Sequence, residues 1–262
     1  MSFIFNINPI IQALLATIFT WSITALGAAL VFMFKKINKN ILDSMLGMSA
    51  GVMIAASFWS LLSPSIDMAT IMHMNVMLVV SSGFLSGGLL LFIGDKITSK
   101  FQNKTGLSTN KRVLMLITSI TLHNIPEGLA VGVAFGSTLY GLDGATLMSA
   151  WTLALGIGIQ NFPEGTAVSV PLRREGFSRK KAFFYGQLSG IVEPISGVIG
   201  AILVLKIRLV LPFLLAFAAG AMIYVVVEEL IPESQTNESK DLMSMFTLVG
   251  FVIMMILDVL LG

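Results

Sequence analysis

The hexapeptide HNIPEG occupies residues 123–128, and a near copy, QNFPEG, occupies residues 160–165. Both copies place an amide, a proline, a glutamate and a glycine in the same order inside a long apolar stretch. A charged side chain in such a stretch is costly and usually marks a functional site. The doubled motif therefore raises two questions: what structure surrounds it, and what its polar atoms bind.

The composition around the hexapeptides is that of a membrane protein. Of the 262 residues, 55% are hydrophobic and 11% are charged, whereas a typical soluble domain has about 25% charged residues. Continuous apolar runs of about 20 residues, long enough to cross a bilayer as helices, recur along the chain. The sequence predicts an all-α integral membrane protein, one polytopic domain over residues 1–262, with eight transmembrane helices at about 9–34, 41–62, 76–94, 113–135, 144–172, 182–205, 209–231 and 242–261.

The basic residues alternate between the two sides of this predicted membrane protein. Of the 16 Lys and Arg residues, all but Lys206 and Arg208 lie in the loops after the first, third, fifth and seventh spans. Because cytoplasmic loops carry the excess of basic residues, the pattern predicts that both termini are extracytoplasmic. The longest connection, at about 95–112, is polar, and we predict that it is a mobile cytoplasmic loop.

Three glutamates are predicted to lie at one depth, near the bilayer midplane. Glu127 and Glu164 belong to the hexapeptides, and Glu193 lies in the sixth span. An ionised carboxylate at mid-helix costs about 2.5–3.5 kcal/mol, and no Lys or Arg lies inside a predicted span to offset this cost. The compensating positive charge must therefore come from outside the chain.

The polar residues of each hexapeptide share one helix face, because successive residues turn by about 100°. An imidazole, carboxylates and amide oxygens suit borderline divalent metals such as Zn²⁺, Fe²⁺, Mn²⁺ or Cd²⁺, and the chain has no cysteine to supply thiolate ligands. Three carboxylates balance more than one divalent charge, so a two-metal site fits. The candidate ligands are His123, Asn124, Glu127, Gln160, Asn161, Glu164 and Glu193.

Three prolines in the same spans also indicate a buried binding site. Pro126, Pro163 and Pro194 each leave a backbone carbonyl without its helical donor. Non-helical backbone at membrane depth is tolerated where it lines a cavity or is buried in protein. A motif doubled on antiparallel spans is typical of inverted-repeat transporters, whose binding sites lie at the midplane on broken helices.

Other polar residues are candidates for the pathway of the metal. Glu228 and Glu229 lie near the predicted cytoplasmic end of the seventh span. Asp67 and His73 lie in the predicted outer loop after the second span, where they would attract cations. We interpret Asp258, near the outer end of the eighth span, as a terminal charge that reaches the membrane surface.

Two other classes of function compete with metal transport. An intramembrane metalloprotease needs a motif such as H-E-x-x-H, but Asn124 follows His123 and no second histidine lies inside a predicted span. We therefore predict that the protein is not an enzyme. A proton-coupled transporter of a small organic solute would use the buried glutamates as a proton relay, and it stays open as the alternative.

The motifs resemble the ZIP (Zrt/Irt-like protein) family of divalent-metal transporters, in particular its small bacterial GufA-like branch. The segments that carry the resemblance are the two hexapeptides, Glu193-Pro194, GVMIAASFWSLLSPSID at 51–67 and EELIPE at 228–233. The resemblance implies eight helices in a 3+2+3 inverted repeat. It implies a metal importer, foremost for zinc, that works by alternating access in the bacterial plasma membrane.

The resemblance also implies the partners and the ligand sets. Divalent metal ions and the lipid bilayer are the expected partners, with no nucleic acid and no cofactor besides the transported metal; a homodimer is left open. One metal would be held by His123, Glu127, Gln160 and Glu164, with Met53 nearby. A second would be held by Asn124, Asn161 and Glu193, with Glu127 and Glu164 shared as bridges. Ser60 would lie along the pathway and Asp67 at its outer mouth.

Transport in this family implies a sliding motion of two helix groups. Spans 1, 4, 5 and 6 would move against spans 2, 3, 7 and 8. We predict that small residues allow close sliding between the groups. These residues are Gly27, Ala28, Ala29, Gly83, Gly87 and Gly88.

Overall fold

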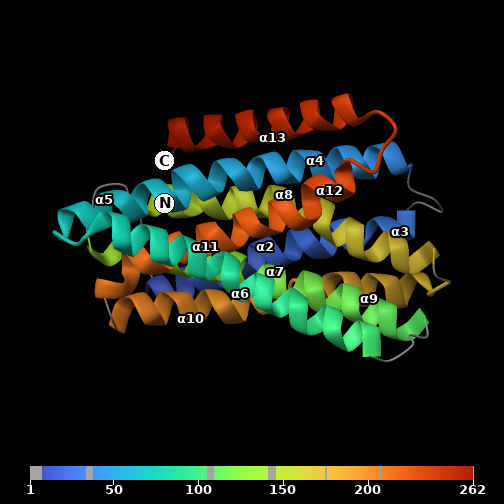
Figure 1. Cartoon of the computed structure of the whole chain (residues 1–262), viewed down its shortest axis with the longest axis horizontal. Coiled ribbons are helices and arrows are strands. Elements are labelled where there is room, and N and C mark those ends of the chain that lie inside the picture. The colour runs from blue at the N-terminus through green and yellow to red at the C-terminus, as the bar shows by residue number, and fades with distance from the viewer. Residues whose placement is uncertain are drawn as a thin grey trace.

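The long apolar runs form long helices that lie roughly side by side (Figure 1). The structure is a computed structural model that describes residues 8–33, 38–104, 109–140, 146–174, 176–206 and 208–261. Within these ranges it describes the backbone but not the side chains of residues 98–104, 109–120, 122, 123, 140, 171, 174, 205, 206, 208 and 261. The described chain is helical apart from short turns, which confirms the predicted all-α class.

Asparagine and serine residues begin several of the helices. Asn8, Asn38, Asn75 and Ser178 accept hydrogen bonds from free N–H groups in the first turns of α2, α4, α6 and α9. The helices are α2 (Pro9–Ala28), α3 (Leu30–Met33), α4 (Lys39–Ala56), η1 (Ser57–Leu62), α5 (Ser63–Ile71), α6 (Val76–Lys104), α7 (Thr109–Ser137), η2 (Thr138–Tyr140), α8 (Leu147–Arg174), α9 (Arg179–Ser189), α10 (Val192–Lys206), η3 (Arg208–Val210), α11 (Leu211–Val225), η4 (Val226–Leu230), α12 (Ile231–Ser234) and α13 (Lys240–Leu261).

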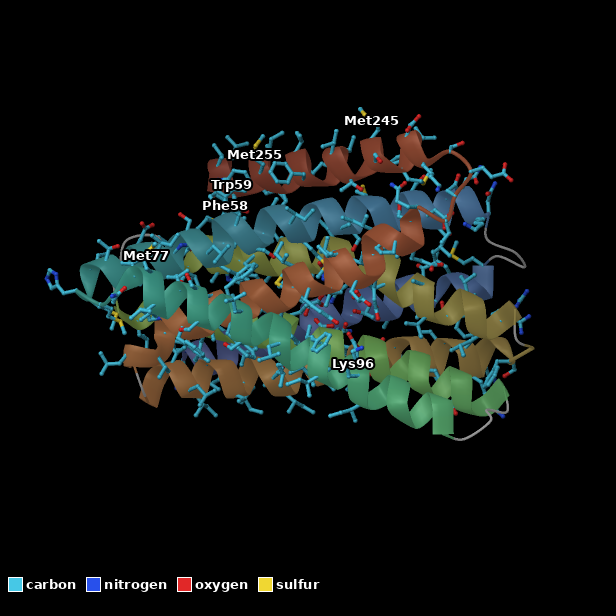
Figure 2. The ribbon with its side chains drawn as sticks, viewed as in Figure 1. Phe58, Trp59, Met77, Lys96, Met245 and Met255 are labelled. Carbon is cyan, nitrogen blue, oxygen red and sulfur yellow. The ribbon has the colours of Figure 1, made fainter. Side chains whose placement is uncertain are left out.

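Six helical segments of the described chain are long and apolar enough to cross a membrane. Helices α7 and α8, which carry the hexapeptides, are 29 and 28 residues long and are not among these six. Six of the eight predicted spans are thus found, and the other two stay predictions. At the surface of the bundle, Met245 points outward (Figure 2), and Phe58, Met77 and Met245 are all more than half exposed, as expected of side chains that face lipid. The six segments are 9–33, 39–71, 76–97, 179–204, 211–234 and 240–260.

Two predicted loops are largely helical. Helices α4, η1 and α5 form one continuous segment to Ile71, so Asp67 lies on a helix and not in the predicted outer loop. Pro64 does not end this segment: the helix continues into α5 from the π-helical turn η1 directly before it. The predicted loop 95–112 is helical up to Lys104 and again from Thr109, and 105–108 lie outside the described residues.

The prolines of the hexapeptides do not interrupt their helices. Helix α7 continues through Pro126, and α8 continues through Pro163, so the prediction of broken helices is wrong for these two spans. Neighbouring helices and side chains in a membrane bundle commonly compensate for the lost bond. The sixth span does break, because α9 ends at Ser189 and α10 starts at Val192, directly before Glu193 and Pro194.

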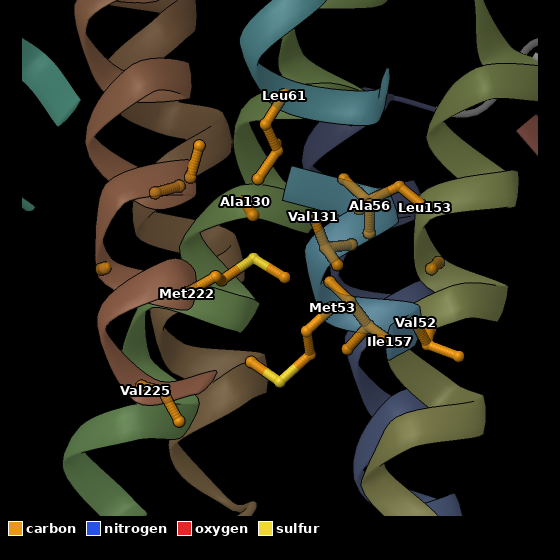
Figure 3. Packing of buried hydrophobic residues seen from close by; sticks show 14 of the residues in the cluster. Val52, Met53, Ala56, Leu61, Ala130, Val131, Leu153, Ile157, Met222 and Val225 are labelled. Atoms are coloured by element: carbon orange, nitrogen blue, oxygen red, sulfur yellow. The ribbon is translucent and has the colours of Figure 1, made fainter. Parts of the chain in front are cut away.

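The helices form four closely packed pairs. Helix α2 packs on α8 and α7 on α10, while α4 packs on α13 and α6 on α11. Helix α2 also packs on α10 and α7, so α2, α7, α8 and α10 form one group. The main contacts of this group with the rest of the bundle run between α4 and α8 and between α7 and α11. The apolar core shown in Figure 3 lies there, around Met53, Val131, Ile157 and Met222.

Three of the predicted glycines, Gly27, Gly83 and Gly87, sit inside the pairs and not between the two groups. A Cβ atom at Gly27 would lie 2.0 Å from the carbonyl oxygen of Phe162 in α8, and one at Gly87 would lie 1.9 Å from that of Phe217 in α11. Gly83 likewise faces Phe213 of α11. The prediction that these residues line a sliding surface is therefore wrong: they bring the two helices of one pair into backbone contact.

Candidate metal centre

The polar residues of the hexapeptides meet inside the bundle. Helices α7, α8 and α10 contribute Glu127, Glu164 and Glu193, and no side chain of the three is more than 7% exposed. The charge of Glu164 interacts with those of Glu127 and Glu193, so the structure brings together the three carboxylates that the sequence placed at one depth. Asn124, Gln160 and Asn161 are also buried at this point. His123 lies in α7, and its side chain lies outside the described part of the structure.

Glycines allow the helices of the site to approach each other. A Cβ atom at Gly128, next to Glu127, would lie 2.4 Å from the carbonyl oxygen of Glu193. A Cβ atom at Gly165, next to Glu164, would lie 2.0 Å from the carbonyl oxygen of Thr24 in α2. The glycine of each hexapeptide therefore sets how closely α7 and α8 pack on α10 and α2.

A chain of amide groups joins two of the carboxylates. Gln160 donates from Nε2 to Oε1 of Glu127 and, at 3.2 Å, to Oδ1 of Asn161. Asn161 in turn donates from Nδ2 to both carboxylate oxygens of Glu193, at 3.0 and 2.9 Å. The amide donors of α8 thus partly offset the negative charge that α7 and α10 bring to the site.

Several buried oxygens at the site have no hydrogen-bond partner. They are Oδ1 of Asn124, Oε1 of Gln160 and Oε1 of Glu164. A buried acceptor without a donor costs about 1–3 kcal/mol, whereas a cation would turn such oxygens into ligands. Carboxylate, amide and imidazole groups are a donor set that Zn²⁺ and similar ions accept, so the residues present fit a divalent metal ion.

The carboxylates do not themselves form a closed metal cage. Among the described side chains, no three His, Cys, Asp or Glu residues lie close enough together to hold one ion. The amide groups of Gln160 and Asn161 lie beside Glu127 and Glu193 instead. A metal ion here would therefore need amide oxygens, His123 or movement of the glutamates to complete its ligand set.

Helix α2 contributes hydroxyl groups that the sequence analysis missed. Thr20 donates from Oγ1 to Oε2 of Glu193, and Thr24 donates to Oε1 at 3.5 Å. Both threonines are fully buried. The signal was present in the sequence, because Thr17, Thr20 and Thr24 recur at the spacing of one helix face.

The break in the sixth span leaves room for the carboxylate of Glu193. A Cβ atom at Gly190 would lie 3.0 Å from Oε1 of Glu193 and 3.1 Å from Oγ1 of Thr24. Trp21 of α2 donates from Nε1 to the carbonyl oxygen of Gln187, at 2.9 Å, near the end of α9. Helix α2 therefore supports both the break and the glutamate beside it.

Loss of the hydroxyl of Thr20 should destabilise the protein. We expect Thr20→Val to cost about 1.5–3 kcal/mol, the range for a hydrogen bond to a charged group, because Glu193 loses a buried donor. Thr17→Val is the matched control, because the hydroxyl of Thr17 bonds only to carbonyl oxygens of its own helix. Thermal unfolding of the purified proteins in detergent measures both, and equal midpoints for the two variants would contradict the expectation.

The outer pathway candidates lie apart from one another. Ser60 in η1 donates to Oδ1 of Asp258 in α13 at 2.8 Å, and it lines a cavity of about 20 Å³ with Ser137 and Ser149. Asp258 is only 9% exposed, so the interpretation of this residue as a surface-reaching terminal charge is wrong. Its hydrogen bond to Ser60 keeps it inside the bundle. Asp67 and His73 are exposed, and His73 adopts a φ of 53° in the turn before α6.

The remaining candidates, Glu228, Glu229 and Met53, come from η4 and α4. Glu228 is exposed and Glu229 is half-buried, and both lie in η4, a π-helical segment at the cytoplasmic end predicted for this span. Glu229 interacts with the charge of Glu164, which connects this end to the site. Met53 is fully buried and lies near Met222 and Val225 between α4 and α11 (Figure 3).

Comparison with known proteins identifies zinc transporters as relatives of this chain. Residues 102–258 match the family model described as ZIP zinc transporter. The chain is 40% identical to the zinc transporter ZIP11 of Homo sapiens, with 97% of this chain and 98% of the relative covered. It is 32% identical to the zinc transporter GufA of Myxococcus xanthus, covering 95% and 98%. It is 36% identical to the zinc transporter ZIPB of Bordetella bronchiseptica, covering 91% and 78%.

Proposed function

Because the chain belongs to the ZIP zinc transporter family, a family of multi-pass membrane proteins, we propose that it moves zinc toward the cytoplasm through the buried site on α7, α8 and α10. Its relatives are transporters and not enzymes, which agrees with the absence of a metalloprotease motif from the sequence. The single observation that carries the proposal is the set of unpartnered oxygens on α7 and α8, buried in the region where the charge of Glu164 interacts with those of Glu127 and Glu193.

The metal ion would bind between the two hexapeptides. Its ligands would be His123 and Glu127 from α7 and Gln160 and Glu164 from α8. The thioether sulfur of Met53 would lie near the ion as an additional, soft ligand. Two of these residues, Gln160 and Glu164, already present oxygens without hydrogen-bond partners. Two carboxylates neutralise one divalent ion, so binding would remove the cost of holding them in an apolar bundle.

The family resemblance implies a second metal position beside the first. That position would involve Asn124, Asn161 and Glu193, with Glu127 and Glu164 as shared ligands. Asn124 offers an oxygen without a partner, but both oxygens of Glu193 already accept hydrogen bonds from Asn161. The two positions are therefore unequal in this chain.

Alternating access would move the site between the two sides of the membrane. The group α2, α7, α8 and α10 would move as a unit against the helices of the other two pairs. Support comes from the backbone contacts at Gly27 and Gly132, which join helices inside this group. The packing of α2 on α8 matches that of α10 on α7, and the packing of α4 on α13 matches that of α11 on α6, as a 3+2+3 inverted repeat requires. Metal would enter past Asp67 and Ser60 and leave past Glu228 and Glu229.

The alternative, a proton-coupled transporter of an organic solute, has less support. The relatives carry the name zinc transporter, and the described side chains at the site supply no Lys or Arg to hold an anionic solute. Unpartnered oxygens also favour a cation over a solute that brings its own acceptors.

The proposed orientation predicts a labelling pattern. A cysteine at His73, in the exposed turn before α6, should react with a membrane-impermeant thiol reagent in intact cells. A cysteine at Glu238, exposed before α13, should react only after the membrane is opened. The natural chain has no cysteine, so the background is clean. The reverse pattern would overturn the extracytoplasmic placement of both termini.

Uptake into proteoliposomes tests the proposed function. Purified protein in sealed vesicles should take up zinc faster than protein-free vesicles, and the rate should saturate with zinc concentration. Unlabelled cadmium, manganese and iron added in excess would rank the metals by competition. Zinc uptake equal to that of empty vesicles would reject metal transport.

A further inference from the structure

Every oxygen of the Glu193 carboxylate is hydrogen-bonded. Oε2 accepts from Thr20 and, at 2.9 Å, from Nδ2 of Asn161. Oε1 accepts from Thr24 at 3.5 Å and from the same Nδ2 at 3.0 Å. Glu193, Asn161 and Thr20 are buried. The Asn161 amide therefore sits directly in front of both carboxylate oxygens, where a cation would otherwise bind.

The surroundings decide which way the Asn161 amide points. Its Oδ1 accepts from Nε2 of Gln160 at 3.2 Å, while Nδ2 donates to Glu193 and, at 3.3 Å, to the carbonyl oxygen of Thr20. A reversed amide would place Oδ1 against three acceptor oxygens and Nδ2 against a donor. Only the observed orientation pairs donors with acceptors throughout, so Asn161 presents N–H groups and not an oxygen to Glu193.

The two halves of the site thus differ in the atoms they offer to metal. On the side of Gln160 and Glu164, buried oxygens have no partner. On the side of Glu193, a metal ion would have to displace hydrogen bonds from Asn161, Thr20 and Thr24, and Asn161 would add no negative charge in return. A carboxylate whose donors are already in place loses these charge-assisted hydrogen bonds when a metal enters.

We propose that the Asn161 amide takes the place of the second metal ion, so that the protein binds one zinc ion at its buried site and Glu193 acts as a positioning residue. Glu193 then joins α2, α8 and α10 through hydrogen bonds and does not coordinate zinc. This inference rests on the proposed function, because it assumes a zinc ion in the first position. It departs from the two-metal arrangement that the sequence resemblance implies.

Metal stoichiometry tests the inference. Elemental analysis of purified protein, equilibrated with excess zinc and freed of unbound ions, should give one zinc per chain for the wild type. Asn161→Asp replaces the donor by an oxygen and adds a charge beside Glu193, so this variant should bind two. Asn237→Asp is the matched control: Asn237 is also buried and donates to a carboxylate, Asp43, at 2.8 Å, outside the site. It should stay at one zinc.

Each outcome decides between the alternatives. Two zinc ions in the wild type, or one in a folded Asn161→Asp protein, would overturn the inference while leaving zinc transport intact. A second zinc in both Asn161→Asp and Asn237→Asp would also overturn it, because the gain would not depend on Glu193. No zinc in any of the proteins would overturn the proposed function and the inference with it. Should Asn161→Asp fail to fold, the wild-type stoichiometry alone still decides.

Discussion

Replacement of Glu164 by alanine is expected to abolish zinc uptake while the protein still folds. Glu164 presents a buried oxygen without a hydrogen-bond partner and lies close enough to Glu127 and Glu193 for their charges to interact. Removing it deletes a ligand and half of the charge that balances the ion. The loss should exceed the roughly 10–100-fold that even an outer-shell partner of a metal ligand contributes. Uptake of radioactive zinc by cells expressing the variant measures the effect.

The loss of zinc uptake should not result from unfolding of the Glu164→Ala protein. Without metal, Glu164 repels the neighbouring carboxylates, so alanine removes a cost as well as a contact. We expect expression and helix content close to those of the wild type. Asp241→Ala, which removes an exposed carboxylate at the start of α13, is the control and should leave uptake unchanged. Normal zinc uptake by Glu164→Ala would show that metal does not pass through this site.

The second large effect concerns the backbone contact between α6 and α11. A Cβ atom at Gly87 would lie 1.9 Å from the carbonyl oxygen of Phe217, and backbone cannot move aside as a flexible side chain can. Gly87→Ala should therefore force the two helices apart and cost more than about 3 kcal/mol, above the usual range for overpacking. We expect little folded protein after purification in detergent.

The neighbouring glycine provides a matched control for Gly87. A Cβ atom at Gly88 would meet nothing closer than the carbonyl oxygen of Gly220 at 3.6 Å, an ordinary contact. Gly88→Ala should fold as the wild type does or gain up to about 1 kcal/mol from the better helix propensity of alanine. Size-exclusion profiles and thermal unfolding of the two variants measure the difference. Equal behaviour would mean that α6 and α11 are not packed at backbone contact.

The sequence indicated that the three glutamates lie near one another, but it did not indicate the residues that support them. The hexapeptides and Glu193 could be placed at one depth because a regular helix converts residue number into depth at about 1.5 Å per residue. The same regularity predicted that the polar residues of each hexapeptide lie on one face of their helix, α7 or α8. Thr20 and Thr24 were missed because the spacing of threonines marks a helix face but does not indicate what their hydroxyl groups bind. The hydroxyl groups of both threonines donate to Glu193, and only the fold shows that this glutamate lies opposite them.

Prolines and glycines were the least predictable residues. Pro126 and Pro163 lie within continuous helices, and only Pro194, which follows Gly190 and Glu193, accompanies a break. Whether a proline interrupts a helix depends on neighbours that compensate the lost hydrogen bond, and these come from other helices. Gly27 and Gly87 were recognised as contact residues, but the partner helix cannot be read from one sequence. Both contacts proved to lie inside helix pairs.

The predicted positions of helix ends were also partly wrong. The predicted loop 95–112 was inferred from polar composition, and Asp67 was placed in a loop because the second span was predicted to end at about residue 62, yet both regions are largely helical. Polar residues mark where a helix leaves the apolar layer, not where its hydrogen bonds stop. The prediction for Asp258 was wrong because nearness to a helix end was taken to mean exposure to water. Its position near a predicted helix end suggested exposure, whereas Ser60 of a neighbouring helix holds it inside the bundle.

The location of bound zinc tests the central claim most directly. Diffraction data from crystals of the zinc-loaded protein, collected on both sides of the zinc absorption edge, give an anomalous map that marks the ion. We predict one strong peak between α7 and α8, at coordination distance, about 2.0–2.2 Å, from carboxylate oxygens of Glu127 and Glu164 and from the imidazole of His123. A map whose zinc peaks lie only elsewhere, such as at Glu228 and Glu229, would contradict the claim that the paired hexapeptides hold the transported metal.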